Sequence, residues 1–228
     1  MARLLPPAVV VAALALLAAG ALAADPPKPA ELPLVFEDDF AKGAGAWEPT
    51  DPAAWKVIDT PRGKAFSQFQ QSKFEPPHRS PFNFALVKGV TVGDLVLDGD
   101  VQSTTRDYDH RDVVVVFGYQ DRAHFYYTHL GKKTDDHANQ VFIVNDKPRV
   151  KISTKTTPGT PWTDNWHHVR VVRKVADGTI EVYFDDLKTP VMTATDKTFT
   201  WGRVGVGTFD DTANWTGIKL RGTKVEKK

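Results

Sequence analysis

Residues 95–105 read LVLDGDVQSTT, and their side chains alternate with the two-residue period of a β-strand. One face of this predicted strand takes Leu95, Leu97, Gly99, Val101 and Ser103, and the other takes Val96, Asp98, Asp100, Gln102 and Thr104. A mainly apolar face opposite a mainly polar face is typical of an antiparallel sheet that packs on a core with one side only. This segment therefore predicts a β-sandwich sheet.

The same pattern extends in both directions along the chain. We expect further strands at residues 34–40, 55–59, 64–69, 82–87, 113–119, 124–130, 141–144, 149–153, 166–173, 179–185, 191–195, 203–208 and 217–221. No ten-residue stretch of this region carries a helical stripe. The fold class is therefore all-β, a two-sheet antiparallel β-sandwich of the jelly-roll type, formed by one domain at residues 34–228. A closed barrel is the alternative, and we expect the first and last strands to pair.

The first 33 residues predict export. Residues 9–22 form a short apolar run after Arg3, and Ala21-Leu22-Ala23 matches a cleavage signal, so residues 1–23 are interpreted as a signal peptide. An uncleaved anchor helix is the alternative. Residues 24–33 form a proline-rich tether, and the domain is expected to be secreted or periplasmic, with no membrane span after cleavage. The chain has no cysteine and a net charge of +1, so we expect neither disulfides nor a nucleic-acid partner.

Residues 106–140 read RDYDHRDVVVVFGYQDRAHFYYTHLGKKTDDHANQ and hold four of the seven histidines and three of the five tyrosines. We predict a hairpin of residues 113–119 and 124–130 with a turn at 120–123. This register places Val114 beside His129 and Val116 beside Tyr127. Tyr127 and His129 share one face of their strand. We expect that face to be exposed, because polar residues follow in the next loop.

Several motifs carry a resemblance to a known group of folds. They are FEDDF at residues 36–40, WKV at 55–57, the alternating strand at 94–103, WHHV at 166–169 with IEVYFDD at 180–186, and the glycines of 202–207 with FDD at 209–211. This series resembles the concanavalin A-like lectin/glucanase superfamily, in its laminin-G-like and 3-keto-disaccharide hydrolase branches. The resemblance implies carbohydrate ligands, in some members hydrolysis and in some a structural Ca²⁺. The E-x-D-x-x-E string of the glucanases and the Asn-Ser-Gly-Ile strand of the hydrolase branch are both missing from this chain.

The candidate site residues come mainly from the hairpin region. Candidate substrate-binding residues are His110, Arg111, Tyr127, His129, His137, Gln140 and Trp162. Arg111 could clamp a uronate or a phosphate, or form a solvated ion pair. Tyr127 and His129 could act as the acid and base of a lyase, or lie in the core. Trp162 could stack on a sugar ring, or plug the edge of the core.

The sequence also contains two candidate groups of metal ligands. A Ca²⁺ site could combine Asp38 or Asp39 with Asp210 or Asp211 if the terminal strands pair. His129 and His137 flank two aspartates, Asp135 and Asp136, and these types of side chain also suit Zn²⁺ or Mn²⁺, although the spacing matches no fixed motif.

Three functional hypotheses remain open from the sequence. The leading one is a glycan-binding domain, because aromatic and amide side chains are dense and no convincing acid pair is present. The second is an enzyme, a hydrolase of 3-keto or other modified glycosides or a polysaccharide lyase. The third is a non-catalytic structural or adhesion protein of the cell envelope.

Overall fold

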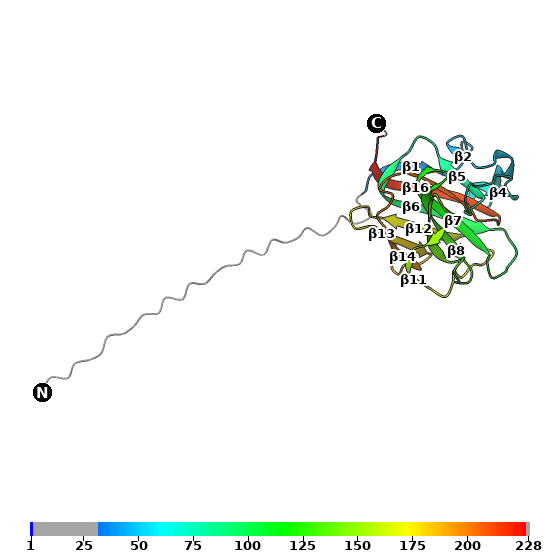
Figure 1. The fold of residues 1–228 in the computed structure, drawn as a ribbon. Helices are drawn as coiled ribbons and strands as arrows, with labels where there is room; N and C mark the ends of the chain where they lie inside the picture. Colours follow the sequence, from blue (N-terminus) through cyan, green and yellow to red (C-terminus); the bar gives the residue numbers. More distant parts are fainter. Residues whose placement is uncertain (2–31, 227–228) are drawn as a thin grey trace.

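The alternating segment forms the twelve-residue strand β6 (Val92–Ser103) near the middle of a nine-stranded antiparallel sheet. The computed structural model describes Met1 and residues 32–226 (Figure 1). The predicted signal peptide and nearly all of the tether lie outside the described residues. In the described part of the chain, no helix is long and apolar enough to cross a membrane.

Two antiparallel sheets account for the described strands. The nine-stranded sheet has the order β11 (Ser153–Thr156), β14 (Met192–Thr195), β13 (Thr179–Phe184), β12 (His167–Arg173), β6, β16 (Ala213–Lys224), β4 (Gly63–Gln68) and β3 (Trp55–Thr60), with β1 (Leu34–Asp38) paired to β16. The seven-stranded sheet has the order β10 (Val150–Lys151), β9 (Gln140–Asn145), β8 (His124–Gly131), β7 (Asp112–Asp121), β15 (Arg203–Thr208), β5 (Asn83–Val87) and β2 (Trp47–Pro49). A 3₁₀ turn, η2 (Pro52–Ala54), precedes β3. The all-β sandwich prediction is confirmed.

The first and last strands pair as expected. Figure 1 shows β1 along β16, and Asp38 lies opposite Ile218. One expected strand is wrong in detail, because residues 149–153 divide between the two sheets. β10 lies at the edge of the seven-stranded sheet. After Ile152 the chain enters β11, which starts at Ser153 and lies at the edge of the nine-stranded sheet.

The main core lies between the sheets. The apolar residues of β6, Leu95, Leu97 and Val101, are at most 3% exposed and belong to this core, as the alternation predicted. The opposite face of β6 is polar. There His168 of β12 lies between two carboxylates, with Nδ1 2.8 Å from Asp100 Oδ1 and Nε2 3.0 Å from Asp98 Oδ1.

The hairpin β7–β8 has the predicted register but not the predicted turn. Val114 lies opposite His129 and Val116 opposite Tyr127. The register then shifts after Phe117, where Gly118 has a φ of +57°, so that Asp121 rather than Tyr119 faces His124. The left-handed backbone at Gly118 suits glycine, which has no Cβ to clash.

A second apolar cluster covers the outer face of the seven-stranded sheet. Because Val113 and Val115 belong to the main core, their neighbours Val114 and Val116 must point outward. The outward cluster contains Phe84, Leu86, Val114, Val116, Phe125, Tyr127, Phe142, Val144 and Phe209, with Phe74, Phe82 and Tyr119 packed against it. The outer face of this sheet is therefore largely filled by aromatic rings rather than open to water.

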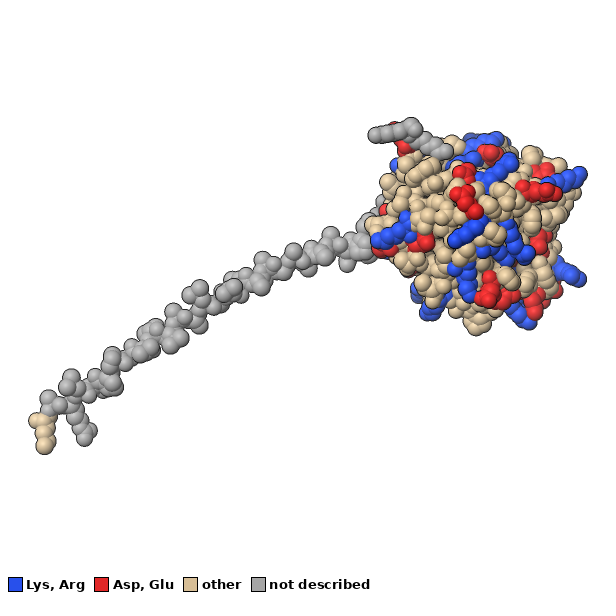
Figure 2. Space-filling view, viewed as in Figure 1, with Lys and Arg blue, Asp and Glu red and all other residues tan. Residues whose placement is uncertain are grey.

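Charge is mixed on the surface. On the face that Figure 2 shows, Lys and Arg side chains lie among Asp and Glu side chains. This mixture agrees with the net charge of +1 over the whole chain.

Candidate functional site

A cavity of about 170 Å³ lies beside the ends of β7 and β8 on the outer face of the seven-stranded sheet. Its wall combines one residue of each of these strands with residues of the surrounding loops. The lining residues are Arg79, Tyr108, His110, Asp112, His129, His137, Arg149, Phe209 and Asp210. The predicted candidates His110, His129, His137 and Asp210 thus come together at one place.

His129 is the most constrained side chain of the cavity. Its ring is buried and stacks on Phe209, with 5.4 Å between the ring centroids and 7° between the planes. Its Nδ1 lies 3.2 Å from Nη1 of Arg149, and the same Nη1 donates to the Tyr127 hydroxyl at 2.8 Å. The Arg149 guanidinium also lies over the ring of Phe209, 4.4 Å from its centroid. Arg149 therefore fixes the position of the imidazole from the solvent side.

Three carboxylates meet next to this ring. Each of Asp112, Asp210 and Asp211 offers an oxygen within 4.8 Å of the others. Asp112 accepts from Phe209 N at 2.8 Å, whereas Asp211 accepts from Tyr108 Oη and from Asp112 N, both at 2.8 Å. Burial and then the neighbouring charge of Asp112 raise the pKa of the Asp211 carboxyl.

The carboxylates that the fold brings together differ from the expected Ca²⁺ ligands. The described residues bring Asp112 to Asp210 and Asp211, whereas Asp38 and Asp39 do not join that group. Asp38 instead accepts from the indole Nε1 of Trp47 at 2.9 Å. The three carboxylates have the oxygen chemistry that Ca²⁺ uses. However, the guanidinium groups of Arg79 and Arg149 line the same cavity and already supply positive charge.

The second expected metal group is not assembled either. Asp135 pairs with His110, with 2.8 Å between Oδ2 and Nε2. Asp136 pairs with Lys151 at 2.6 Å. Among the described residues, His129 and His137 therefore share the cavity wall without these two aspartates as common ligands.

Arg111 does not face the cavity, contrary to the anion-clamp prediction. Its side chain is 1% exposed, and Nη2 donates to Ser103 O at 2.8 Å and to Thr163 O at 3.0 Å. A further bond joins Nε to Ser103 Oγ at 3.0 Å. Arg111 therefore ties the loop before β12 to the end of β6.

Tyr127 lies on the predicted face, but that face is not exposed at this point. Tyr127 is 0% exposed under Arg149, and burial raises the pKa of its phenol. Gln140 is also buried, and its Nε2 donates to Asp135 O at 2.8 Å. Both side chains support the wall of the cavity from behind, so the prediction of an exposed Tyr127 and His129 is wrong.

Trp162 plugs the edge of the core, which was the alternative to a stacking platform. It is 5% exposed, donates from Nε1 to Leu130 O at 2.7 Å and packs edge-on against Phe184. The hydrogen bond from the indole N–H to Leu130 O holds the loop of Trp162 against the end of β8.

Four residues of the cavity were not among the predicted site residues. Arg79 and Arg149 come from different loops, and Arg149 N donates to Arg79 O at 3.1 Å. Tyr108 and Phe209 flank the carboxylates. Asp112 could have been found, because it ends the charged run His110-Arg111-Asp112 directly before the valines of β7.

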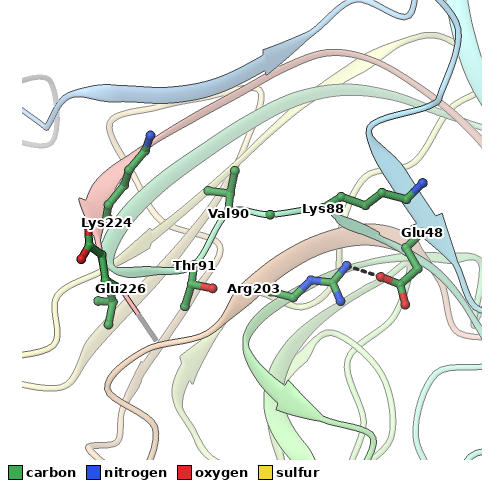
Figure 3. Close-up of a pocket in the computed structure, with 9 residues that line it drawn as sticks. Glu48, Lys88, Val90, Thr91, Arg203, Lys224 and Glu226 are labelled. Atoms are coloured by element: carbon green, nitrogen blue, oxygen red, sulfur yellow. Dashed lines mark hydrogen bonds and ion pairs between the residues drawn. The ribbon is translucent and has the colours of Figure 1, made fainter. Parts of the chain in front are cut away.

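A larger cavity of about 650 Å³ lies elsewhere, at the edge formed by β2, β15 and the end of β16 (Figure 3). Its charged groups are mostly engaged with the protein. Arg203 Nη2 donates to Glu48 at 2.7 Å, and Lys88 Nζ donates to Gly45 O at 2.9 Å. It also has no aromatic side chain in its wall. The smaller cavity therefore combines histidine, arginine, carboxylate and aromatic side chains in its wall, which the larger cavity does not.

Comparison with known proteins supports the fold. No family model matches the chain, and no curated protein matches it. Among solved structures, the carbohydrate-binding module CBM66 from Bacillus subtilis is 18% identical, with a TM-score of 0.54, over 78% of this chain and 96% of that one. The cellulose induced protein Cip1 is 14% identical, with a TM-score of 0.55, over 85% and 100%. A B. subtilis protein of unknown function with a galectin-like fold is 9% identical, with a TM-score of 0.53, over 85% and 97%. The fold of this chain is thus a β-sandwich of the concanavalin A-like kind.

Proposed function

We propose that the chain is a carbohydrate-binding domain and that the cavity beside β7 and β8 takes one sugar residue. The observation that carries the proposal is the mixture of groups in this cavity. Arginine and histidine donors lie around a carboxylate acceptor, Asp210, beside the aromatic ring of Phe209. Sugar hydroxyls both donate and accept hydrogen bonds, which matches donors and an acceptor placed side by side.

The size of the cavity supports a small ligand. Its volume of about 170 Å³ is below the roughly 300–1,000 Å³ of sites for drug-sized molecules. One sugar ring is therefore a better match than a buried oligosaccharide. The likeness of the fold to CBM66, described as a carbohydrate-binding module, agrees with this assignment.

Binding is favoured over lyase chemistry carried out by Tyr127 and His129, because of the state of the phenols in this region. Burial raises the pKa of both Tyr108 and Tyr127, so neither phenol is suited to act as a base near neutral pH. Asp112 and Asp211 accept hydrogen bonds from the protein itself. The sequence-based acid/base pair of Tyr127 and His129 therefore gains no support.

A panel of methyl glycosides tests the proposal. Glucose, galactose, mannose, xylose, arabinose, fructose and glucuronic acid derivatives would be screened for a rise in melting temperature, and hits measured by calorimetry. For a sugar that binds, Asp210→Asn should weaken the affinity at least tenfold. Asp59→Asn, an exposed aspartate on β3 paired with Lys64, is the matched control and should change nothing. Absence of binding to every sugar, or equal effects of the two variants, would contradict the proposal.

We also propose that the domain acts outside the cytoplasm, after cleavage behind Ala23. The support is the apolar run of residues 9–22 and the Ala21-Leu22-Ala23 signal. N-terminal sequencing of the exported protein tests it, with Ala24 as the expected first residue. An intact Met1 on the mature protein would contradict cleavage.

A further inference from the structure

One buried ring nitrogen of the cavity has no hydrogen-bond partner among the described residues. His129 is 4% exposed, and its Nε2 makes no hydrogen bond among the described residues. Asp112 Oδ2 lies 3.3 Å from this nitrogen, but without the geometry of a hydrogen bond. Leaving a buried polar group unpaired costs free energy, so such a group at a binding site points to a ligand atom as its partner.

Arg149 determines what kind of partner Nε2 needs. A guanidinium is always protonated and can only donate, so Nδ1 of His129 must accept at the 3.2 Å contact with Nη1. The neutral imidazole then carries its proton on Nε2. A doubly protonated ring would place an N–H against the guanidinium. The unpartnered nitrogen is therefore a donor, and it requires an acceptor oxygen rather than a metal ion.

The surroundings of Nε2 match a hydroxyl group better than a bare acceptor. Asp112 Oδ2 lies 3.3 Å from this nitrogen, and Asp210, which offers an oxygen within 4.8 Å of one from Asp112, lines the same cavity. A hydroxyl oxygen can accept from Nε2–H and donate its own proton to a carboxylate. An anionic ligand group could accept from Nε2–H, but it has no proton to donate to Asp112 or Asp210.

We propose that His129 is the specificity-determining residue of the sugar site. It donates Nε2–H to one hydroxyl of the bound sugar, and Arg149 is the positioning residue that holds the proton on Nε2. This inference rests on the proposed function and adds a chemical requirement to it. One particular hydroxyl of the sugar must be present, because its loss would leave the buried donor without a partner.

The position of the proton can be measured without any sugar. Long-range ¹H–¹⁵N spectra of the histidine rings should show His129 with its proton on Nε2 in the wild-type protein at pH 7. In Arg149→Met this preference should be lost. His124, on the same strand but paired with Asp121 and Asp146, is the internal control and should not change in this variant. A proton on Nδ1, or a doubly protonated His129 in the wild type, would overturn the inference.

The contact with the sugar is tested with the methyl glycoside that binds best in the panel and with its monodeoxy derivatives. One derivative should bind the wild type roughly 10- to 100-fold more weakly than the parent sugar. His129→Phe keeps a ring against Phe209 and should bind the parent and that derivative equally. Should this variant not fold, His129→Gln retains an amide donor and should keep part of the preference.

The outcomes separate the two proposals. Equal binding of all monodeoxy derivatives to the wild type, within about twofold, would overturn the role of His129 while leaving the sugar site in place. No binding of any glycoside would remove both the sugar site and the role of His129 in it. His124→Ala, at the far end of β8, controls for the loss of a histidine and should leave every affinity unchanged.

Discussion

Replacing Arg111 by leucine should destabilise the fold without a direct effect on sugar binding. The guanidinium holds Ser103 through its carbonyl and its hydroxyl, and it also holds Thr163 O and Asp164 Oδ1. Leucine fills much of the space but offers no donor. The variant therefore removes four hydrogen bonds at one place, where β6 ends and the loop before β12 begins.

The magnitude follows from the exposure of each partner. Ser103 is 2% exposed, so its carbonyl loses its partner in the interior, at a cost of about 1–3 kcal/mol. Thr163 O is only partly buried and regains some hydration. The Asp164 side chain is 95% exposed, so its ion pair contributes at most about 1 kcal/mol. Together we expect a loss of about 2–4 kcal/mol, a large part of a typical stability of about 5–15 kcal/mol.

Urea unfolding followed by tryptophan fluorescence measures this loss. Asp164→Ala is the matched control, because it removes the exposed partner only, and it should change the free energy of unfolding by less than about 1 kcal/mol. Sugar affinity of the folded Arg111→Leu protein should equal that of the wild type. A variant that is as stable as the wild type but has lost sugar binding would refute this reasoning and restore the clamp hypothesis.

Three other predictions concern different parts of the sandwich. Hydrogen bonds to Asp100 and Asp98 raise the pKa of His168 to about 9. The contribution of His168 to the free energy of unfolding should therefore be complete below pH 6.5 and should fall as the pH rises towards 9. The melting temperature of the wild type should show this decline, whereas that of His168→Gln should not. Trp162→Ala should cost about 3–5 kcal/mol in chemical unfolding, because a buried indole is lost, and a cost below about 1 kcal/mol would contradict its role in the core. Gly207→Ala should prevent soluble expression, because its Cβ would lie 1.9 Å from Asn83 O, whereas Gly45→Ala meets no atom within 4 Å and should fold normally.

The alternation of polar and apolar residues predicted the side of the sheet on which a residue lies. It placed Leu95 and Val101 in the core, and it placed Tyr127 and His129 on one shared face of their strand. The pairing of Val114 with His129 was predicted from an assumed four-residue turn, and it is confirmed although the turn itself differs. Alternation depends only on neighbouring residues in the sequence, and so does the face of the strand on which a side chain lies.

The same alternation could not predict what covers that outer face. The rings of Phe74, Phe82 and Phe209 come from other parts of the chain and bury the face that the hairpin presents. Arg149 reaches His129 from 20 residues away in the sequence. No short motif marks such contacts, so the predicted site contained the histidines that line the cavity but not the arginines beside them.

The place of β16 in the fold has a consequence for how the protein is made. β16 is the last described strand, yet it pairs with β1, β4 and β6 inside the nine-stranded sheet. A ribosome must therefore release residues 213–224 before this sheet can close. Until then β6 lacks one of its two neighbours, and contacts of such long sequence separation form slowly. The closing of the nine-stranded sheet therefore depends on its C-terminal strand, β16.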